Sequence, residues 1–161
     1  MDFSDELERM TLMDDEFMTV CFERGTLFAE EILRVLLQND SLVVKKVTVQ
    51  RQGTNLLHRN VRFDVLAEDT TGKLYNIEIQ RASEGANPER ARFHLSILDA
   101  NAADKGTAFT DLPETYAIFI TERDIFGDKL PLYHVERMVI ENNKPFGDRA
   151  HVLYVNGEYR G

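Results

Sequence analysis

Two acids and an amide have the types and spacing of a metal-dependent hydrolytic site. Residues 72–81 read GKLYNIEIQR, a strand pattern in which side chains alternate between faces, so Glu78 and Gln80 share one face. Asp64 lies in the preceding strand pattern, NVRFDVLAED. Carboxylate oxygens suit hard cations such as Mg²⁺, and a bound divalent cation can activate water and neutralise charge on a phosphate. The register of the two strands decides whether these residues meet.

The turn at residues 70–72 (Thr-Thr-Gly) suits a three-residue hairpin loop that is closed by a left-handed glycine. Counting back along both strands places Asp64 opposite Glu78 and Arg62 opposite Gln80. Directly opposed β-carbons lie only about 4.5–5.5 Å apart, so two like charges there are destabilising unless a cation lies between them. In the alternative interpretation this face is open to solvent, and Glu78 pairs diagonally with Arg62.

The elements around this hairpin alternate between helix and strand patterns. Residues 15–37 carry apolar side chains at helical spacing, as one long helix or as two short ones that break at Gly25. Asn87-Pro88-Glu89 is typical of a helix start, and this second helix would end by Gly106. Further strands are expected at 41–50, 115–124, 130–141 and 151–159. This order predicts an α/β (or α+β) domain whose mixed central sheet is flanked by helices.

Composition limits the classes of protein to consider. The chain has 161 residues, 43% of them hydrophobic, which suits a single domain over residues 1–161 with a sizeable core. It has no run of about 18 apolar residues, and its first segment is acidic, so we expect a cytoplasmic protein without membrane contact. Cys21 is the only cysteine, which excludes an internal disulfide. The end of the sequence, NGEYRG, carries no terminating signal, so a truncated C-terminus is an open alternative.

Charge is distributed unevenly along the chain. The net charge of −9 argues against a nucleic-acid partner, because Lys and Arg supply most of the attraction to phosphates. Residues 41–62, however, contain Lys45, Lys46 and Arg62 among five bases and no acid. This segment is either a DNA-contacting surface or a solvated strand pair.

The strand containing "R-F-D", the strand "Y-N-I-E-I-Q", the acidic N-terminal helix and the helix RARFHLSILDA together resemble the PD-(D/E)XK nuclease superfamily. The resemblance is closest to its transposase-like, recombination-promoting branch. It extends over nearly the whole chain, since IFITERDIFGDKLPLYHVERM is similar to the next strand and turn of that branch. The resemblance implies a restriction-endonuclease-like core, a mixed central sheet flanked by helices.

By this resemblance, Asp64 is the motif aspartate and Glu78 the second metal-binding acid, with the carbonyl of Ile79 as a further ligand of Mg²⁺ or Mn²⁺. Phe63 stands where the motif nominally has proline. Gln80 stands where the superfamily usually has lysine, and an amide can orient a water but cannot take its proton.

The superfamily often adds a glutamate from the first helix, for which Glu31 or Glu30 is the best match. A solvated helix face is the alternative for this acidic pair. Arg90 and Arg92 are two apart on the second helix and cannot share a face, so one would be a surface charge and the other a partner of the acids. We expect at least one of them to contact the DNA backbone.

The resemblance therefore implies a Mg²⁺-dependent DNA endonuclease, a hydrolase of the transposase or DNA-recombination type. Paired nicking of two strands would suggest a homodimer, by analogy. The alternative is a catalytically weak or inactive nuclease-fold module that binds DNA or a protein partner, which Gln80 and the acidic net charge favour. In a third interpretation the protein is an interaction domain without a catalytic or metal site, and the acids are ordinary solvent-exposed surface residues.

Overall fold

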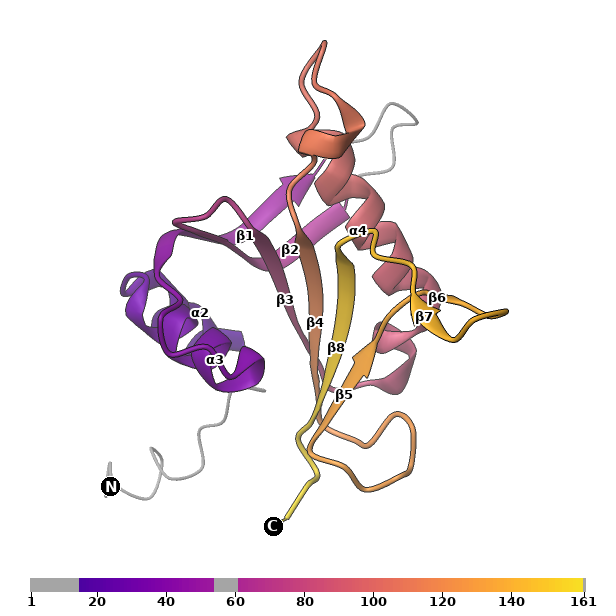
Figure 1. Ribbon diagram of the computed structural model, residues 1–161. Helices are drawn as coiled ribbons and strands as arrows, with labels where there is room; N and C mark the ends of the chain where they lie inside the picture. Colours follow the sequence, from indigo (N-terminus) through magenta and orange to yellow (C-terminus); the bar gives the residue numbers. More distant parts are fainter. Residues whose placement is uncertain (1–14, 54–60, 161) are drawn as a thin grey trace, which may run out of the picture.

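A six-stranded mixed sheet forms the centre of the protein in the computed structural model, which describes residues 15–53 and 61–160, with the backbone alone at 15–18, 50–53 and 61–63 (Figure 1). The strands lie in the order β1-β2-β3-β4-β8-β5. β3 and β4 are parallel, as are β4 and β8, whereas the other neighbours are antiparallel. The bounds are β1 (Val44–Gly53), β2 (Val61–Asp69), β3 (Leu74–Gln80), β4 (Thr115–Thr121), β5 (Leu132–Val135) and β8 (Ala150–Asn156).

Helices cover both faces of this sheet. α2 (Asp15–Glu23) and α3 (Leu27–Leu37) lie on one face, and α4 (Pro88–Ala102) lies on the other (Figure 1). Two short 3-10 helices, η1 (Ser83–Ala86) and η2 (Phe109–Asp111), precede and follow α4. The N-terminal helical segment is two helices, because the φ of +122° at Gly25 interrupts the helical backbone between them. The predicted mixed sheet flanked by helices is confirmed.

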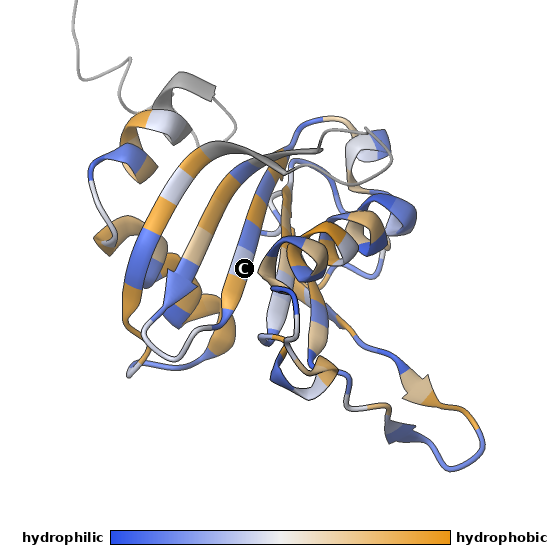
Figure 2. Cartoon of the chain, turned by 90° about the horizontal axis from the view of Figure 1, so that it is seen from above, coloured by the Kyte–Doolittle hydropathy of each residue, from blue (hydrophilic) through white to orange (hydrophobic). Residues whose placement is uncertain are grey.

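The central strand β3 is buried on both faces, and this decides where its polar side chains lie. Tyr75 and Ile77 point toward α2 and α3, in an apolar cluster that includes Leu33. Asn76 and Glu78 point to the opposite face and meet side chains of α4. Figure 2 shows apolar and polar residues alternating along the strands. The site acid Glu78 is therefore enclosed between the sheet and α4 rather than open to solvent.

The start of α4 follows the sequence pattern. The side chain of Asn87 accepts a hydrogen bond from the backbone N of Arg90 (2.8 Å), and Pro88 occupies the first helical position. The amide nitrogen of Asn87 also donates to the carbonyl of Glu84 in η1 (2.8 Å). This cap fixes the first turn of α4 beside the end of β3.

The expectation of one strand over residues 130–141 was wrong. β5 ends at Val135, and β6 (Met138–Val139) pairs instead with β7 (Lys144–Pro145) in a separate hairpin that projects from the sheet (Figure 2). An ion pair between Arg137 and Asp148 joins the two sides of this hairpin at its base. The alternating pattern of the segment is compatible with both arrangements, because it does not specify the partner strand.

The β2–β3 hairpin has the predicted register. Gly72 has a φ of +88°, in the left-handed region, and its N donates to the carbonyl of Asp69 (3.1 Å). The ladder pairs Val65 with Ile77, as the sequence count requires. The same count places the two predicted site acids opposite each other.

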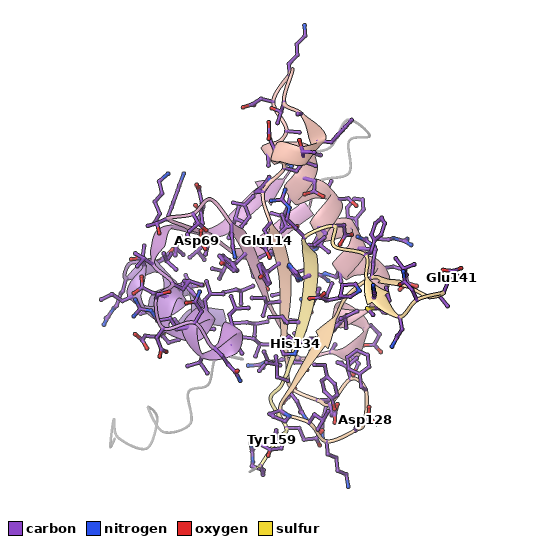
Figure 3. The ribbon with its side chains drawn as sticks, in the orientation of Figure 1. Asp69, Glu114, Asp128, His134, Glu141 and Tyr159 are labelled. Atoms are coloured by element: carbon purple, nitrogen blue, oxygen red, sulfur yellow. The ribbon has the colours of Figure 1, made fainter. Side chains whose placement is uncertain are left out.

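Asp69 closes this hairpin with its side chain. The residue is buried; its Oδ1 accepts from the backbone N of Thr71 (2.8 Å) and of Lys73 (3.0 Å), and its Oδ2 accepts from the hydroxyl of Tyr75 (2.7 Å). Lys73 also pairs with Glu114 (3.0 Å), which lies at the same end of the sheet (Figure 3). Burial alone would raise the pKa of Asp69, but the hydrogen bonds from Thr71, Tyr75 and the backbone outweigh it and lower the pKa.

Asp69→Asn is expected to lower the free energy of unfolding near neutral pH by about 1–3 kcal/mol, because it disrupts one buried and several part-buried hydrogen bonds. A lowered pKa in the folded state means that the stabilisation is present above the ordinary pKa of 3.8 and is lost as pH falls through the folded value. The difference between native protein and variant should therefore shrink below about pH 4. Urea unfolding of both proteins at neutral and acidic pH tests this, with the exposed Asp104→Asn as control. An undiminished difference in acid would contradict the prediction.

Candidate active site

The two predicted site acids interleave at the point where β2 and β3 separate. Among the described pairs, the β2–β3 ladder runs no further than Val65 and Ile77. Beyond it, Oδ2 of Asp64 accepts from the backbone N of Ile79 (3.2 Å), and Oε1 of Glu78 accepts from the backbone N of Asp64 (3.1 Å). Each carboxylate is thus held by the backbone of the opposite strand, and the two side chains are fixed side by side.

Glu78 is fully buried, and one of its carboxylate oxygens accepts no hydrogen bond within the described part of the chain. The exposed fraction of the residue is 0%. Its Oε1 also accepts from Nδ2 of Asn76 (3.0 Å), but its Oε2 has no hydrogen bond within the described part of the chain. Nη2 of Arg90 lies 3.5 Å from Oε2 and forms an ion pair with it. Burying a carboxylate oxygen that accepts no hydrogen bond costs free energy, so the position of this oxygen needs an explanation.

The environment of Glu78 disfavours a second negative charge. Burial, and then the neighbouring carboxylate of Asp64, raise the pKa of Glu78 to about 7. Hydrogen bonds from Asn76 and from the Asp64 backbone, together with Arg90, act in the opposite direction. A cation between the two acids would remove this conflict.

The donor set fits a hard divalent cation. Asp64 and Glu78 offer carboxylate oxygens, and Oε2 of Glu78 accepts no hydrogen bond from the described residues. Over residues 15–53 and 61–160, no group of three or more His, Cys, Asp or Glu side chains is arranged to hold a metal ion. The protein would therefore supply two carboxylates, the number with which Mg²⁺ is commonly held when water and substrate phosphates complete its shell.

A buried histidine and an asparagine extend the site toward α4. Nδ1 of His94 lies 2.9 Å from Oδ1 of Asn76 and 3.5 Å from Oε1 of Glu78. Burial and the nearby Arg90 lower the pKa of His94 to about 4, so the ring is neutral at neutral pH. Its Nδ1 then donates to Asn76, whose amide in turn donates to Glu78. This chain of hydrogen bonds orients the Glu78 carboxylate.

The sequence did not single out His94 or Asn76 as site residues. Strand alternation puts Asn76 on the same face as Glu78, and His94 lies within the second helix pattern, but neither position by itself indicates a role in the site. One signal was available, because Arg90 and His94 are spaced i, i+4 and therefore share a face of α4. What the sequence lacked was the side of the sheet against which that face packs.

Arg90 and Arg92 lie in different surroundings on α4. Arg90 approaches Oε2 of Glu78, and its side chain is 38% exposed. Arg92 is exposed on α4. Arg90 thus extends from the buried acid to the solvent.

The glutamates of α3 are not brought together with the acid pair. Glu30 is buried; its Oε2 accepts from the backbone N of Val44 (2.8 Å), and its Oε1 pairs with Arg34 (2.6 Å). Glu31 has an exposed side chain that also pairs with Arg34 (3.3 Å). α3 packs on the face of the sheet opposite to Glu78 (Figure 1). The expectation that Glu31 or Glu30 adds a ligand finds no support in this geometry.

The predicted basic surface is partly described. Lys45 is exposed and pairs with Glu68 (3.6 Å), and Lys46 is exposed beside it on β1. The backbone of Arg62 lies in β2, but its side chain falls outside the described residues. No helix of the described chain is long and apolar enough to cross a membrane.

The fold and the paired acids define a restriction-endonuclease-like protein. A family model described as PD-(D/E)XK nuclease family transposase matches residues 30–157. The match covers most of the chain, so this protein belongs to that family, and the resemblance noted in its sequence is confirmed. A search of the curated proteins found no match. The family supports a nuclease-like function with DNA as the partner.

Proposed function

We propose that the protein is a Mg²⁺-dependent DNA endonuclease that hydrolyses phosphodiester bonds in a transposition or recombination reaction. The observation that carries the proposal is the fully buried Glu78, whose Oε2 accepts no hydrogen bond from a described residue and whose carboxylate interlocks with that of Asp64 through the two strand backbones. Two adjacent acids in a closed, low-dielectric setting are unfavourable for stability alone. They are favourable where a cation must be held.

In this proposal Asp64 and Glu78, with the carbonyl of Ile79, hold Mg²⁺ or Mn²⁺. The bound cation would supply a water with a lowered pKa and would neutralise charge on the attacked phosphate. Gln80 orients the attacking water through its amide. An amide cannot take a proton from that water, so Gln80 is not the general base. Asn76 and His94 keep the Glu78 carboxylate in one orientation.

DNA would approach over the side of the site where Arg90 and Arg92 emerge from α4. Arg90 exchanges its long contact with Glu78 for a phosphate oxygen, and Arg92 contacts the backbone from the exposed surface. Lys45, Lys46 and Arg62 add positive charge on β1 and β2. Because these contacts are electrostatic, binding should weaken as salt concentration rises. A homodimer that cuts two strands stays a prediction.

Gln80 favours one second candidate, a module of nuclease fold that binds DNA without cutting it. An amide offers no positive charge to the transition state, which the lysine common in the superfamily does. The two candidates predict the same metal site and the same DNA surface. They differ only in whether the bond is broken.

Metal removal is the direct test. Supercoiled plasmid incubated with the protein and Mg²⁺ or Mn²⁺ should become nicked or linear, and excess EDTA should reduce cleavage to background, because each metal role is worth several kcal/mol of barrier. Re-addition of metal should restore cleavage. An intact plasmid, together with a metal-dependent shift of DNA in a gel, would replace the nuclease by the binding module.

A further inference from the structure

Gly85 lies against the side chain of Gln80, so closely that any larger residue there would displace the Gln80 amide. A β-carbon built on Gly85 would overlap Oε1 of Gln80 and would lie 2.7 Å from its Cδ and 3.4 Å from its Cγ. By contrast, β-carbons built on Gly72 or Gly106 would meet nothing within 4 Å. The φ of Gly85 is outside the left-handed region, so the backbone itself does not require glycine. The missing side chain is needed because the amide of Gln80 occupies its place.

The segment that carries Gly85 is firmly held. Gly85 lies in η1, where its N donates to the carbonyl of Ala82 (3.1 Å). The next residue, Ala86, is fully buried in the apolar cluster of α4, and its carbonyl accepts from the hydroxyl of Tyr154 in β8 (2.9 Å). η1 is thus anchored to β8, the strand next to β4 on the side away from β3. The backbone around Gly85 is thus held by a turn hydrogen bond on one side and by the buried Ala86 on the other.

Gln80 is fixed from the other side by β3. It pairs with Thr121 of β4, and its carbonyl accepts from the backbone N of Glu122 (3.1 Å). Its side chain leaves the strand on the same face as Glu78, two residues away. The backbone of Gln80 is thus fixed by β3 and β4, and its amide lies in the space that Gly85 leaves free.

We infer that Gly85 is a positioning residue, whose lack of a side chain lets the amide of Gln80 lie in the orientation that the reaction uses. This inference rests on the proposed function, because it assigns Gln80 the orientation of the attacking water. Gly85 itself touches neither metal nor DNA in this role. It acts through Gln80, and this makes the inference testable as a coupling between two residues.

Gly85→Ala should fold normally, because the flexible end of Gln80 can swing away from the new methyl group. Displacement of that amide should lower kcat for plasmid nicking by about 10–100-fold, the scale of a misplaced catalytic contact. KM for DNA should stay within about twofold, because uniform substrate binding is unchanged. Ser83→Ala, an exposed neighbour in the same 3-10 helix, should retain native kcat. Melting temperatures of all variants check that the folds are intact.

The double variant decides whether Gly85 acts through Gln80. Gln80→Ala alone should lower kcat, and adding Gly85→Ala should lower it no further, because the side chain to be displaced is already absent. If Gly85→Ala reduces kcat equally in both backgrounds, the inference is overturned. A Gly85→Ala variant with native kcat would overturn it as well.

A second measurement does not depend on cleavage. In ¹⁵N–¹H spectra, the side-chain amide signals of Gln80 are those that disappear in Gln80→Ala. They should shift in Gly85→Ala and stay in place in Ser83→Ala. Unmoved signals in Gly85→Ala would overturn the inference whether or not the protein cuts DNA. A plasmid that stays intact with native protein would defeat the proposed function separately, while the amide signals still decide the placement of Gln80.

Discussion

Asp64→Asn should abolish metal-dependent cleavage of DNA, with a loss of at least about 10³-fold in rate, and should leave the fold intact. The rate falls because an amide is a much weaker ligand for a hard cation than a carboxylate, and the metal supplies several kcal/mol of barrier reduction. The fold should persist, since the amide oxygen of asparagine can still accept the hydrogen bond that Asp64 now takes from the backbone of Ile79. Nicking of supercoiled plasmid at saturating Mg²⁺ measures the rate.

The matched control for this variant is Asp104→Asn, which makes the same chemical change at an exposed aspartate after α4. It should cleave at the native rate. Titration calorimetry with Mg²⁺ adds a second measurement, in which Asp64→Asn should bind the metal more weakly than either protein. If Asp64→Asn cleaves within about tenfold of native, which is only about 1.4 kcal/mol of barrier, Asp64 is not a metal ligand of the reaction.

Glu78→Gln should also lose cleavage, yet it should make the metal-free protein more stable at mildly alkaline pH. Burial and the carboxylate of Asp64 raise the pKa of Glu78 to about 7, so the folded protein holds this proton more tightly than the unfolded chain does. The contribution of Glu78 to stability is therefore greatest below its ordinary pKa of 4.5 and falls as pH rises through about 7. Glutamine does not ionise, and we expect a gain of about 1–3 kcal/mol near pH 8.

Urea unfolding of native protein and Glu78→Gln, at mildly acidic and mildly alkaline pH and with or without Mg²⁺, tests this prediction. Added Mg²⁺ should stabilise the native protein at the alkaline pH and should have little effect on the variant, because only a folded site that binds metal gains from it. The control is Glu84→Gln, an exposed glutamate of η1. A variant less stable than the native protein in alkaline, metal-free buffer would show that Glu78 serves mainly to hold the fold.

Local sequence rules were sufficient for the hairpin and for the start of α4. The loop with Gly72 determines the register, and the register alone places Asp64 opposite Glu78. Likewise, Asn87 and Pro88 act within a few residues of their own position. These features depend on short-range geometry, which a sequence records directly.

Features that depend on which layers pack together could not be read in the same way. The sequence offered Glu30 and Glu31 as ligands, but α3 packs on the face of the sheet that Glu78 does not occupy. His94 was missed for the same reason. It contacts Asn76 and Glu78 only because α4 packs on their face of the sheet. Gly85 belongs to this group too. Its closeness to Gln80 depends on how η1 folds back against β3, and the residue types between them do not indicate this.

The position of β1 at the border of the sheet has a further consequence for experiments on this protein. A border strand exposes unpaired backbone groups that can recruit a strand from another molecule, and charged side chains, lysine above all, discourage such intermolecular pairing. Lys45 and Lys46 lie on this strand, and Glu30 already occupies the backbone N of Val44 at its beginning. The two lysines therefore disfavour self-association through β1, in addition to forming part of the candidate DNA surface. Neutral substitutions there should be accompanied by light scattering, because lost DNA binding could otherwise be confused with aggregation.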